Sequence, residues 1–232
     1  MAAHLAQRAD TPSIVPALRG PGARGERPDA LAALDRVGTV VTLRHDDSLF
    51  YEDDAAEYYF KVVTGAVRGC KLLADGRRHV GDFYLAGDFI GLDADTRYIF
   101  TAEAVTDTTL VRYQRRSVDA LAWQEPGIGR RLLSLACRGL TAAQHQMLLL
   151  GRKTADERIA SFLLAMAARS GDGEHIVLPM TRTDIGDHLG LTMETVSRAL
   201  SQLKSAGVIA FKNSHEVVIR DRAQLEDIAE TA

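Results

Sequence analysis

Hydrophobic and polar positions follow a strand-like pattern in the first half of the chain. From about residue 31 to 115, short β-prone runs are separated by turn signals that contain glycine. Asp75-Gly76 lies between two of these runs, and such a pair is typical of a tight hairpin because glycine accepts a positive φ. We therefore expect a small antiparallel barrel or roll. The predicted strands are Thr39–Leu43, Tyr58–Val63, Val67–Leu73, His79–Tyr84, Phe89–Leu92 and Thr109–Tyr113.

The pattern then becomes helical. A short helix is predicted at about Ser117 to Trp123, followed by a break at Pro126 and a long helix to about residue 151. Apolar residues recur in this helix at alternating spacings of three and four, which is typical of a coiled-coil seam. We expect the seam to join two copies of the chain, and the alternative is one face of an ordinary buried helix. The seam residues are Leu133, Ala136, Leu140, Ala143, Met147 and Leu150; Leu132, Leu148 and Leu149 lie off the seam and are expected to pack on the chain's own barrel.

Two further helices joined by a tight turn are predicted between residues 181 and 206. They follow a helix that begins after the capping-box pair Thr154 and Glu157, and a short strand before Pro179. Gly190 is a natural end for the first of the two helices, and Thr192 is positioned to cap the second. This arrangement predicts a helix-turn-helix, with a second helix that buries Val196, Leu200 and Leu203.

The opposite face of that second helix is suited to contact with DNA bases. Arg198 could bond guanine bidentately, Glu194 could accept from cytosine, and Ser197 and Met193 could meet neighbouring thymines. The alternative for Glu194 and Arg198 is a solvated surface ion pair, because they lie four residues apart. The predicted DNA-binding residues are Glu194, Ser197, Arg198, Met193, Thr192, Thr181, Arg182, Thr183, Ser201 and Lys212.

Two strands around Asn213-Ser214 follow as a hairpin wing that could touch the DNA backbone. Arg182, Lys204 and Lys212 could pair with phosphates there. The segment 152–232 nevertheless holds ten Lys and Arg against twelve Asp and Glu, and the whole chain has a formal charge of −3. DNA binding must therefore depend on where the charges lie, and we expect it to be sensitive to salt.

A chain of 232 residues with 46% hydrophobic residues can form two domains of ordinary size. We expect a mobile tail at 1–30, a roll at 31–115, a dimerisation helix at 116–151 and a winged helix-turn-helix at 152–232. The two cysteines, Cys70 and Cys137, are interpreted as small buried hydrophobes, although a redox role stays open. No export signal and no membrane span is predicted, so we expect a cytoplasmic protein.

The chain resembles the CRP/FNR superfamily of bacterial transcription regulators, and most closely its FixK-like branch. In the first half the resemblance rests on Gly65-Ala-Val-Arg-Gly69, Asp75-Gly-Arg77 and Ala86-Gly-Asp-Phe-Ile-Gly91; in the second half it rests on the block from Met180 to Arg198. The resemblance implies an α+β fold, a homodimer, double-stranded DNA and RNA polymerase as partners, and an activating role. Because Glu194, Ser197 and Arg198 match the E-x-x-S-R pattern of the FNR branch, it also implies a TTG-N8-CAA type of palindrome.

Departures from the family pattern limit the expected ligands. Cyclic-AMP-binding members have glutamate where this chain has Leu92, and Arg-Ser where it has Phe100-Thr101. The N-terminal cysteines that hold an iron–sulfur cluster in oxygen-sensing members are absent. We therefore expect no cofactor and no metal. The chain then resembles the FixK-type members, and this resemblance implies a place in microaerobic, nitrogen-fixation or denitrification control.

Two alternatives remain open. The same fold could be a sensor with a small molecule among Tyr58, Tyr59, Phe83, Tyr84, Phe89 and Phe100, although these aromatic residues are better explained as core. A nucleotide-dependent enzyme is a remote alternative, because the GxGxxG pattern at Gly20–Gly25 lies in the Pro/Arg-rich tail rather than between a strand and a helix. His188 is interpreted as a polar surface position and not as a metal ligand.

Overall fold

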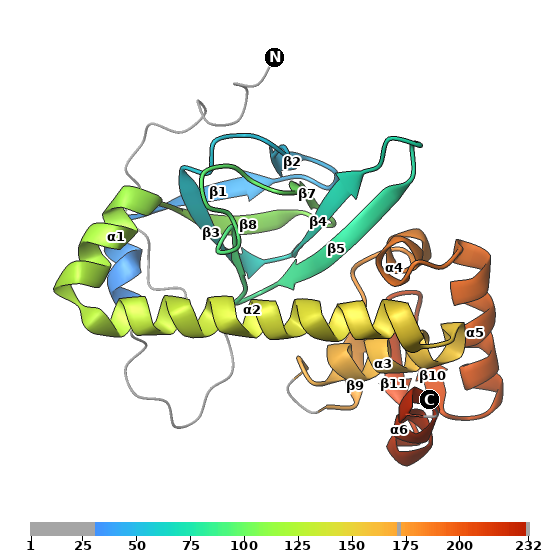
Figure 1. Cartoon of the computed structure of the whole chain (residues 1–232). Helices are drawn as coiled ribbons and strands as arrows, with labels where there is room; N and C mark the ends of the chain where they lie inside the picture. Colours follow the sequence, from blue (N-terminus) through green and yellow to red (C-terminus); the bar gives the residue numbers. More distant parts are fainter. Residues whose placement is uncertain (1–30, 171–172, 231–232) are drawn as a thin grey trace. The chain divides into compact units, whose positions relative to one another are not determined.

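The computed structural model describes residues 31–170 and 173–230, and these divide into two compact units (Figure 1). The first unit contains the described residues up to Ala74 and Gly81–Thr141, and the second contains Asp75–Val80 and Ala142 onward. The tail expected at 1–30, including Gly20–Gly25, lies outside the described residues. The α+β architecture predicted from the sequence is confirmed, with antiparallel sheets first and a winged helix-turn-helix last.

Two four-stranded antiparallel sheets form the roll of the first unit. One has the order β1-β8-β3-β6 and the other the order β2-β7-β4-β5. Their inner faces enclose a core that includes Phe60, Val62, Val67, Ile90 and Leu110. The strands are β1 (Gly38–Leu43), β2 (Ser48–Phe50), β3 (Tyr58–Thr64), β4 (Ala66–Leu72), β5 (Arg78–Leu85), β6 (Phe89–Ile90), β7 (Thr101–Ala104) and β8 (Thr108–Gln114).

The sequence pattern missed two strands and extended a third. β2 is only three residues long, and the buried positions of β7 are the alanines 102 and 104, so neither strand gives a strong hydrophobic signal. β6 ends at Ile90 because Gly91 adopts a positive φ of 89°. At the predicted hairpin, Gly76 has φ 86°, as the Asp-Gly turn requires.

Helical elements cover the outer side of the first sheet. A second core forms there, in which Leu34, Val118 and Ile128 pack with Val111 and Tyr113. The elements are the 3₁₀ helix η1 (Ala32–Arg36), α1 (Arg115–Gln124) and the long helix α2 (Pro126–Arg152), which begins at the predicted break. Cys137, expected to be buried, is exposed on α2 because the packed face of this helix runs through Leu132 and Leu135; Cys70 is buried as expected.

The second unit is built from helices around a three-stranded sheet. Its elements are α3 (Ala155–Ala167), β9 (His175–Val177), α4 (Arg182–Leu189), α5 (Met193–Ser205), β10 (Ile209–Phe211), β11 (Glu216–Ile219) and α6 (Arg222–Glu230). The sheet order is β10-β11-β9, so the short strand before Pro179 joins the predicted wing. The capping box of Thr154 and Glu157 begins α3, as predicted.

Candidate nucleic-acid interface

Helix α4 begins at a capping box. The Thr181 hydroxyl accepts from the Asp184 backbone N–H at 3.1 Å, and the Asp184 carboxylate accepts from the Thr181 backbone N–H at 3.0 Å. Two backbone donors that the helix itself cannot satisfy thereby gain partners. Thr181 was predicted as a DNA-binding residue, and the structure gives it this capping role as well.

The turn between α4 and α5 needs two glycines. Gly190 ends α4 with φ 65°, a left-handed conformation that side chains disfavour. At Gly186 a Cβ atom would lie 2.7 Å from the Leu191 carbonyl oxygen, and the Leu191 N–H donates to the Gly186 carbonyl at 2.9 Å. Gly190 was predicted from the sequence, whereas the close approach at Gly186 has no local sequence signal.

Helix α5 is amphipathic in the way the sequence predicts. Its buried residues are Val196, Ala199, Leu200 and Leu203. The Thr192 hydroxyl accepts from the Thr195 backbone N–H at 3.2 Å, which caps the helix. On the other side of the helix, Met193, Glu194, Arg198 and Ser201 are exposed and Ser197 is partly exposed.

The two charged residues on this face do not pair with each other. Among the described residues, neither the Glu194 carboxylate nor the Arg198 guanidinium has a hydrogen-bond or ion-pair partner. The surface ion pair considered from their spacing is therefore not formed. Both charged groups are left with solvent, and both are available to polar groups of another molecule.

The other predicted contacts surround α5. Thr181, Thr183 and Lys212 are exposed. Arg182 is partly buried, with its guanidinium 5.5 Å from the centre of the Phe211 ring in β10. The Ser201 hydroxyl donates to the Ser197 carbonyl at 2.7 Å, and the turn of the wing is closed where the Asn213 side chain accepts from the His215 N–H at 2.8 Å.

The segment Asp75–Val80, which is distant in the sequence, contacts α4 through side-chain hydrogen bonds. Arg78, in the Asp75–Val80 segment of the second unit, donates to Asp184 at 2.6 Å and to Asp187 at 2.8 Å. Sequence reasoning missed Arg78, because nothing local in the sequence connects residues that lie 106 positions apart.

His188 is part of the same contact, so the surface position expected for it is wrong. Its Nδ1–H donates to the Val80 carbonyl at 3.0 Å, and its ring centre lies 5.9 Å from that of Phe162. Burial lowers the pKa of the His188 imidazole, the hydrogen bond to Val80 opposes this, and the nearby His79 lowers it further.

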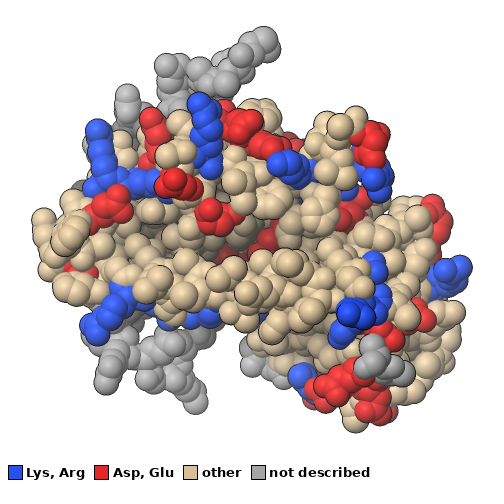
Figure 2. Space-filling model, in the orientation of Figure 1, with Lys and Arg blue, Asp and Glu red and all other residues tan. Residues whose placement is uncertain are grey.

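The predicted seam on α2 is largely uncovered. Leu133, Leu140 and Met147 are 65%, 62% and 72% exposed, so the described part of the chain does not bury them as an ordinary packed helix face. Leu148, expected to pack on the barrel, is also 64% exposed. Figure 2 shows the surface over α2 as a band with few charged side chains. Such a surface favours an interface with another molecule.

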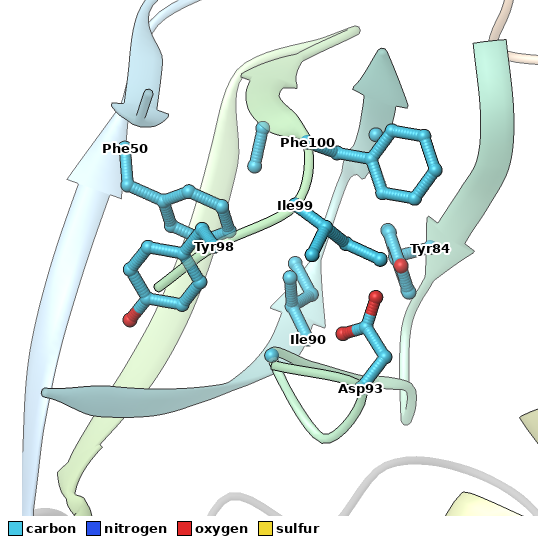
Figure 3. Close-up of a pocket in the computed structure, with 10 residues that line it drawn as sticks. Phe50, Tyr84, Ile90, Asp93, Tyr98, Ile99 and Phe100 are labelled. Carbon is cyan, nitrogen blue, oxygen red and sulfur yellow. The ribbon is translucent and has the colours of Figure 1, made fainter. Parts of the chain in front are cut away.

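The roll holds a small pocket in the first unit (Figure 3). Tyr84, Phe100 and Ile99 point into it, and the free space is about 10 Å³, roughly enough for one water molecule. Asp93 is its only charged lining residue among those described. Leu92 packs with the core on the other side of the sheet. A cyclic nucleotide needs room and a positive group for its phosphate, so these residues do not fit one.

The described residues contain neither a membrane-spanning helix nor a group of metal-binding side chains. No helix among residues 31–170 and 173–230 is long and apolar enough to cross a membrane. Within the same ranges, no three His, Cys, Asp or Glu side chains gather in a way that could hold a metal ion.

Comparisons with known proteins agree with this arrangement. Residues 40–124 match a model described as a cyclic nucleotide-binding domain, and residues 157–228 match a Crp-like helix-turn-helix domain. The nitrogen fixation regulation protein FixK of Azorhizobium caulinodans is 44% identical over 194 residues, covering 82% of this chain and 78% of that protein. FixK of Rhizobium meliloti is 41% identical over 78% of this chain and 82% of its own length.

A solved structure, FixK2 from Bradyrhizobium japonicum, superposes with a TM-score of 0.80 at 45% identity, covering 84% of this chain and 99% of that one. The two FixK relatives are regulation proteins rather than enzymes, and this overturns the enzyme alternative.

Proposed function

This chain belongs to the CRP/FNR family of transcription regulators, and on that premise we propose that it is an activator that binds a TTG-N8-CAA type of palindrome as a homodimer. The observation that supports the proposal most directly is the exposed face of α5. It presents a guanidinium and a carboxylate, on Arg198 and Glu194, that have no partner within the described chain. A charged group without a partner in its own chain can form strong, charge-assisted hydrogen bonds with complementary groups of another molecule.

Within each half-site, Arg198 donates to the O6 and N7 atoms of a guanine, and Glu194 accepts from the N4 amino group of the paired cytosine. Ser197 and Met193 contact neighbouring thymines, where an apolar side chain can meet the methyl group. The four residues lie on the first two turns of α5, which is the part of a recognition helix that contacts base edges.

Contacts to the DNA backbone come from the elements beside α5. Thr181, Thr183 and Arg182 lie at the start of α4, where helix N–H groups also favour phosphate. Thr192 caps the start of α5, Ser201 lies three residues beyond Arg198 on the same helix, and Lys212 lies in the wing. These contacts position the protein without selecting a sequence.

The dimer forms through α2. A palindrome has two-fold symmetry, and a symmetric pair of chains presents the same α5 face to each half-site. The exposed side chains of Leu133, Leu140 and Met147 supply an apolar surface for that contact, with Ala136, Ala143 and Leu150 completing the seam. Two copies can bury this surface against each other.

No small molecule is needed for binding. The small size of the pocket in the roll, and Asp93 as its charged lining residue, support this part of the proposal. In the cytoplasm, the protein acts with RNA polymerase in microaerobic, nitrogen-fixation or denitrification control. The names of the two FixK relatives, which are nitrogen fixation regulation proteins, support the nitrogen-fixation part of that role.

Fluorescence anisotropy of the purified protein tests the proposal. The probe is a TTG-N8-CAA duplex, compared with a scrambled duplex of equal length at two salt concentrations, first without effector and then with cyclic AMP. Binding that is tight, specific and weakened by salt without effector is the expected result. Specific binding only after cyclic AMP is added would instead favour the ligand-gated sensor.

A further inference from the structure

The end of α2 and the end of α4 meet inside the second unit. A helix leaves its last four carbonyl groups without partners in its own backbone, so such ends need donors from elsewhere. Residues Ala142 to Arg152 of α2 and all of α4 belong to this unit. Seam residues Ala143, Met147 and Leu150 lie on the same stretch of α2.

One guanidinium serves the carbonyl groups at both helix ends. Arg158, in the first turn of α3, donates from Nε to the Lys153 carbonyl, from Nη2 to the Leu150 carbonyl and from Nη1 to the Leu189 carbonyl, each at 2.9 Å. Arginine suits this position because its planar fork offers five donors in fixed directions. Its positive charge also favours helix C-termini, where the backbone dipoles are negative.

Two other side chains strengthen the same junction. Gln146, on α2, donates from Nε2 to the His188 carbonyl at 2.9 Å. Lys153, just after α2, donates from Nζ to the Ser161 hydroxyl at 2.8 Å and to the Ala229 carbonyl at 2.7 Å. The end of α2 is therefore bonded to α3, α4 and α6, and Arg158 makes the contacts that reach both α2 and α4.

This junction lies between the dimer seam and the recognition helix. α4 is followed directly by the Gly190 turn and α5, so its last carbonyls are next to the start of the recognition face. In a symmetric dimer, the distance and angle between the two α5 helices depend on how each α4 is held against its own α2. A change of one base pair between half-sites moves one of them by about 3.4 Å and rotates it by about a tenth of a turn.

We propose that Arg158 is the positioning residue that makes the dimer select one spacing between the two half-sites. This inference rests on the proposed function, since it assumes a palindrome bound by two copies. Arg158 does not contact the bases. It holds α4 to the seam helix, so that only one spacing lets both recognition helices bind at once.

The test compares full-length wild type, Arg158→Met and Arg158→Lys on a series of duplexes from TTG-N6-CAA to TTG-N10-CAA. Methionine keeps much of the apolar stem and removes all three hydrogen bonds, whereas lysine keeps the charge without the fork. Arg152→Met is the matched control, because Arg152 is an exposed arginine at the end of α2, six residues before Arg158. Anisotropy gives the dissociation constant for each duplex.

Wild type and Arg152→Met are expected to prefer one spacing by about tenfold or more, which corresponds to about 1.4 kcal/mol. In Arg158→Met the preference is expected to fall to about threefold or less, with Arg158→Lys between the two. Discrimination between TTG and a scrambled half-site should remain in both variants, because the α5 face is unchanged.

A uniform loss of affinity at every spacing in Arg158→Met, with the preference kept, would show a purely structural role and overturn the proposal. So would a wild type that binds TTG specifically but accepts all spacings equally. If Arg158→Met fails to fold, Gln146→Leu is the second variant, because it removes one hydrogen bond to α4 and should still reduce the preference for one spacing. An unchanged spacing preference in both Gln146→Leu and Arg158→Lys would also overturn the proposal. Failure of the wild type to distinguish TTG at all would instead remove the proposed function.

Discussion

The Arg78 guanidinium lies 2.6 Å from the carboxylate of Asp184, a residue 106 positions further along the chain. The Asp184 side chain is only 2% exposed, and it also accepts from the Thr181 N–H and hydroxyl at the start of α4. A buried carboxylate is costly unless it is paired and hydrogen-bonded. Arg78 therefore stabilises the charge that caps the first helix of the DNA-binding motif.

Replacing Arg78 with alanine should destabilise the second unit. The Asp184 carboxylate would keep its bonds to Thr181 but lose its cationic partner, at a cost of about 1 to 3 kcal/mol. The measurement is the free energy of unfolding in urea, followed by circular dichroism. Arg77→Ala is the control, because Arg77 is a neighbouring exposed arginine whose partner is Asp75, and it should change the value by less than about 0.5 kcal/mol.

A double-mutant cycle separates the ion pair from other effects. Arg78→Ala and Asp184→Asn should show a coupling free energy of about 0.5 to 3 kcal/mol. Strictly additive effects of the two substitutions would mean that the contact contributes nothing to stability.

His188 should make stability depend on pH. Burial lowers its pKa in the folded protein below the usual 6.5, so the unfolded chain binds the proton first as the pH falls. Stability that is present above about pH 6.5 should then decrease on acidification until the lower folded pKa is reached. Urea midpoints measured between about pH 7.5 and 5.5 follow this decrease.

His188→Gln should flatten that pH profile, because glutamine keeps an N–H donor for the Val80 carbonyl and does not titrate. His145→Gln, which replaces an exposed histidine on α2, is the control. An identical slope in wild type and His188→Gln would place the pH dependence in other groups.

Arg198→Ala should relax the choice of bases. Loss of a bidentate contact to guanine is expected to cost about 1 to 3 kcal/mol on the cognate duplex and less on duplexes changed at that base pair. Anisotropy on a set of single-base variants measures the difference. A specificity profile that matches wild type would mean that Arg198 does not contact a base.

Lys212→Ala should behave differently. Its loss should weaken binding to all sequences about equally and reduce the salt slope by about 1, as expected for a phosphate contact. Sequence-dependent loss of affinity would contradict that role.

Glutamates at Leu140 and Met147 should separate the dimer. Two-fold symmetry brings the new charges of both chains into the same apolar interface, where an unpaired charge costs several kcal/mol. Sedimentation should then give monomers, and binding to the palindrome should be weak. Leu72→Glu, at an exposed leucine of β4, is the control and should stay dimeric; a double variant that also sediments as wild type would remove the seam from the interface.

The sequence by itself determined the features that depend on near neighbours in the chain. The Asp75-Gly76 turn, the Thr154 capping box, the Gly190 end of α4 and the buried stripe of α5 each depend on residues a few positions apart. These local rules were sufficient for the fold class and for the set of exposed residues on α5.

Only the tertiary structure decided which distant groups meet. The contacts of Arg78 with Asp184, of His188 with Val80 and of Arg158 with the ends of α2 and α4 join segments that local patterns treat separately. It also decided that Cys137 and Leu148 are exposed, since a hydrophobic residue on a helix is buried only if another element covers that face. Hydrogen bonds and burial between distant segments depend on how the chain packs, and packing has no local signature in the sequence.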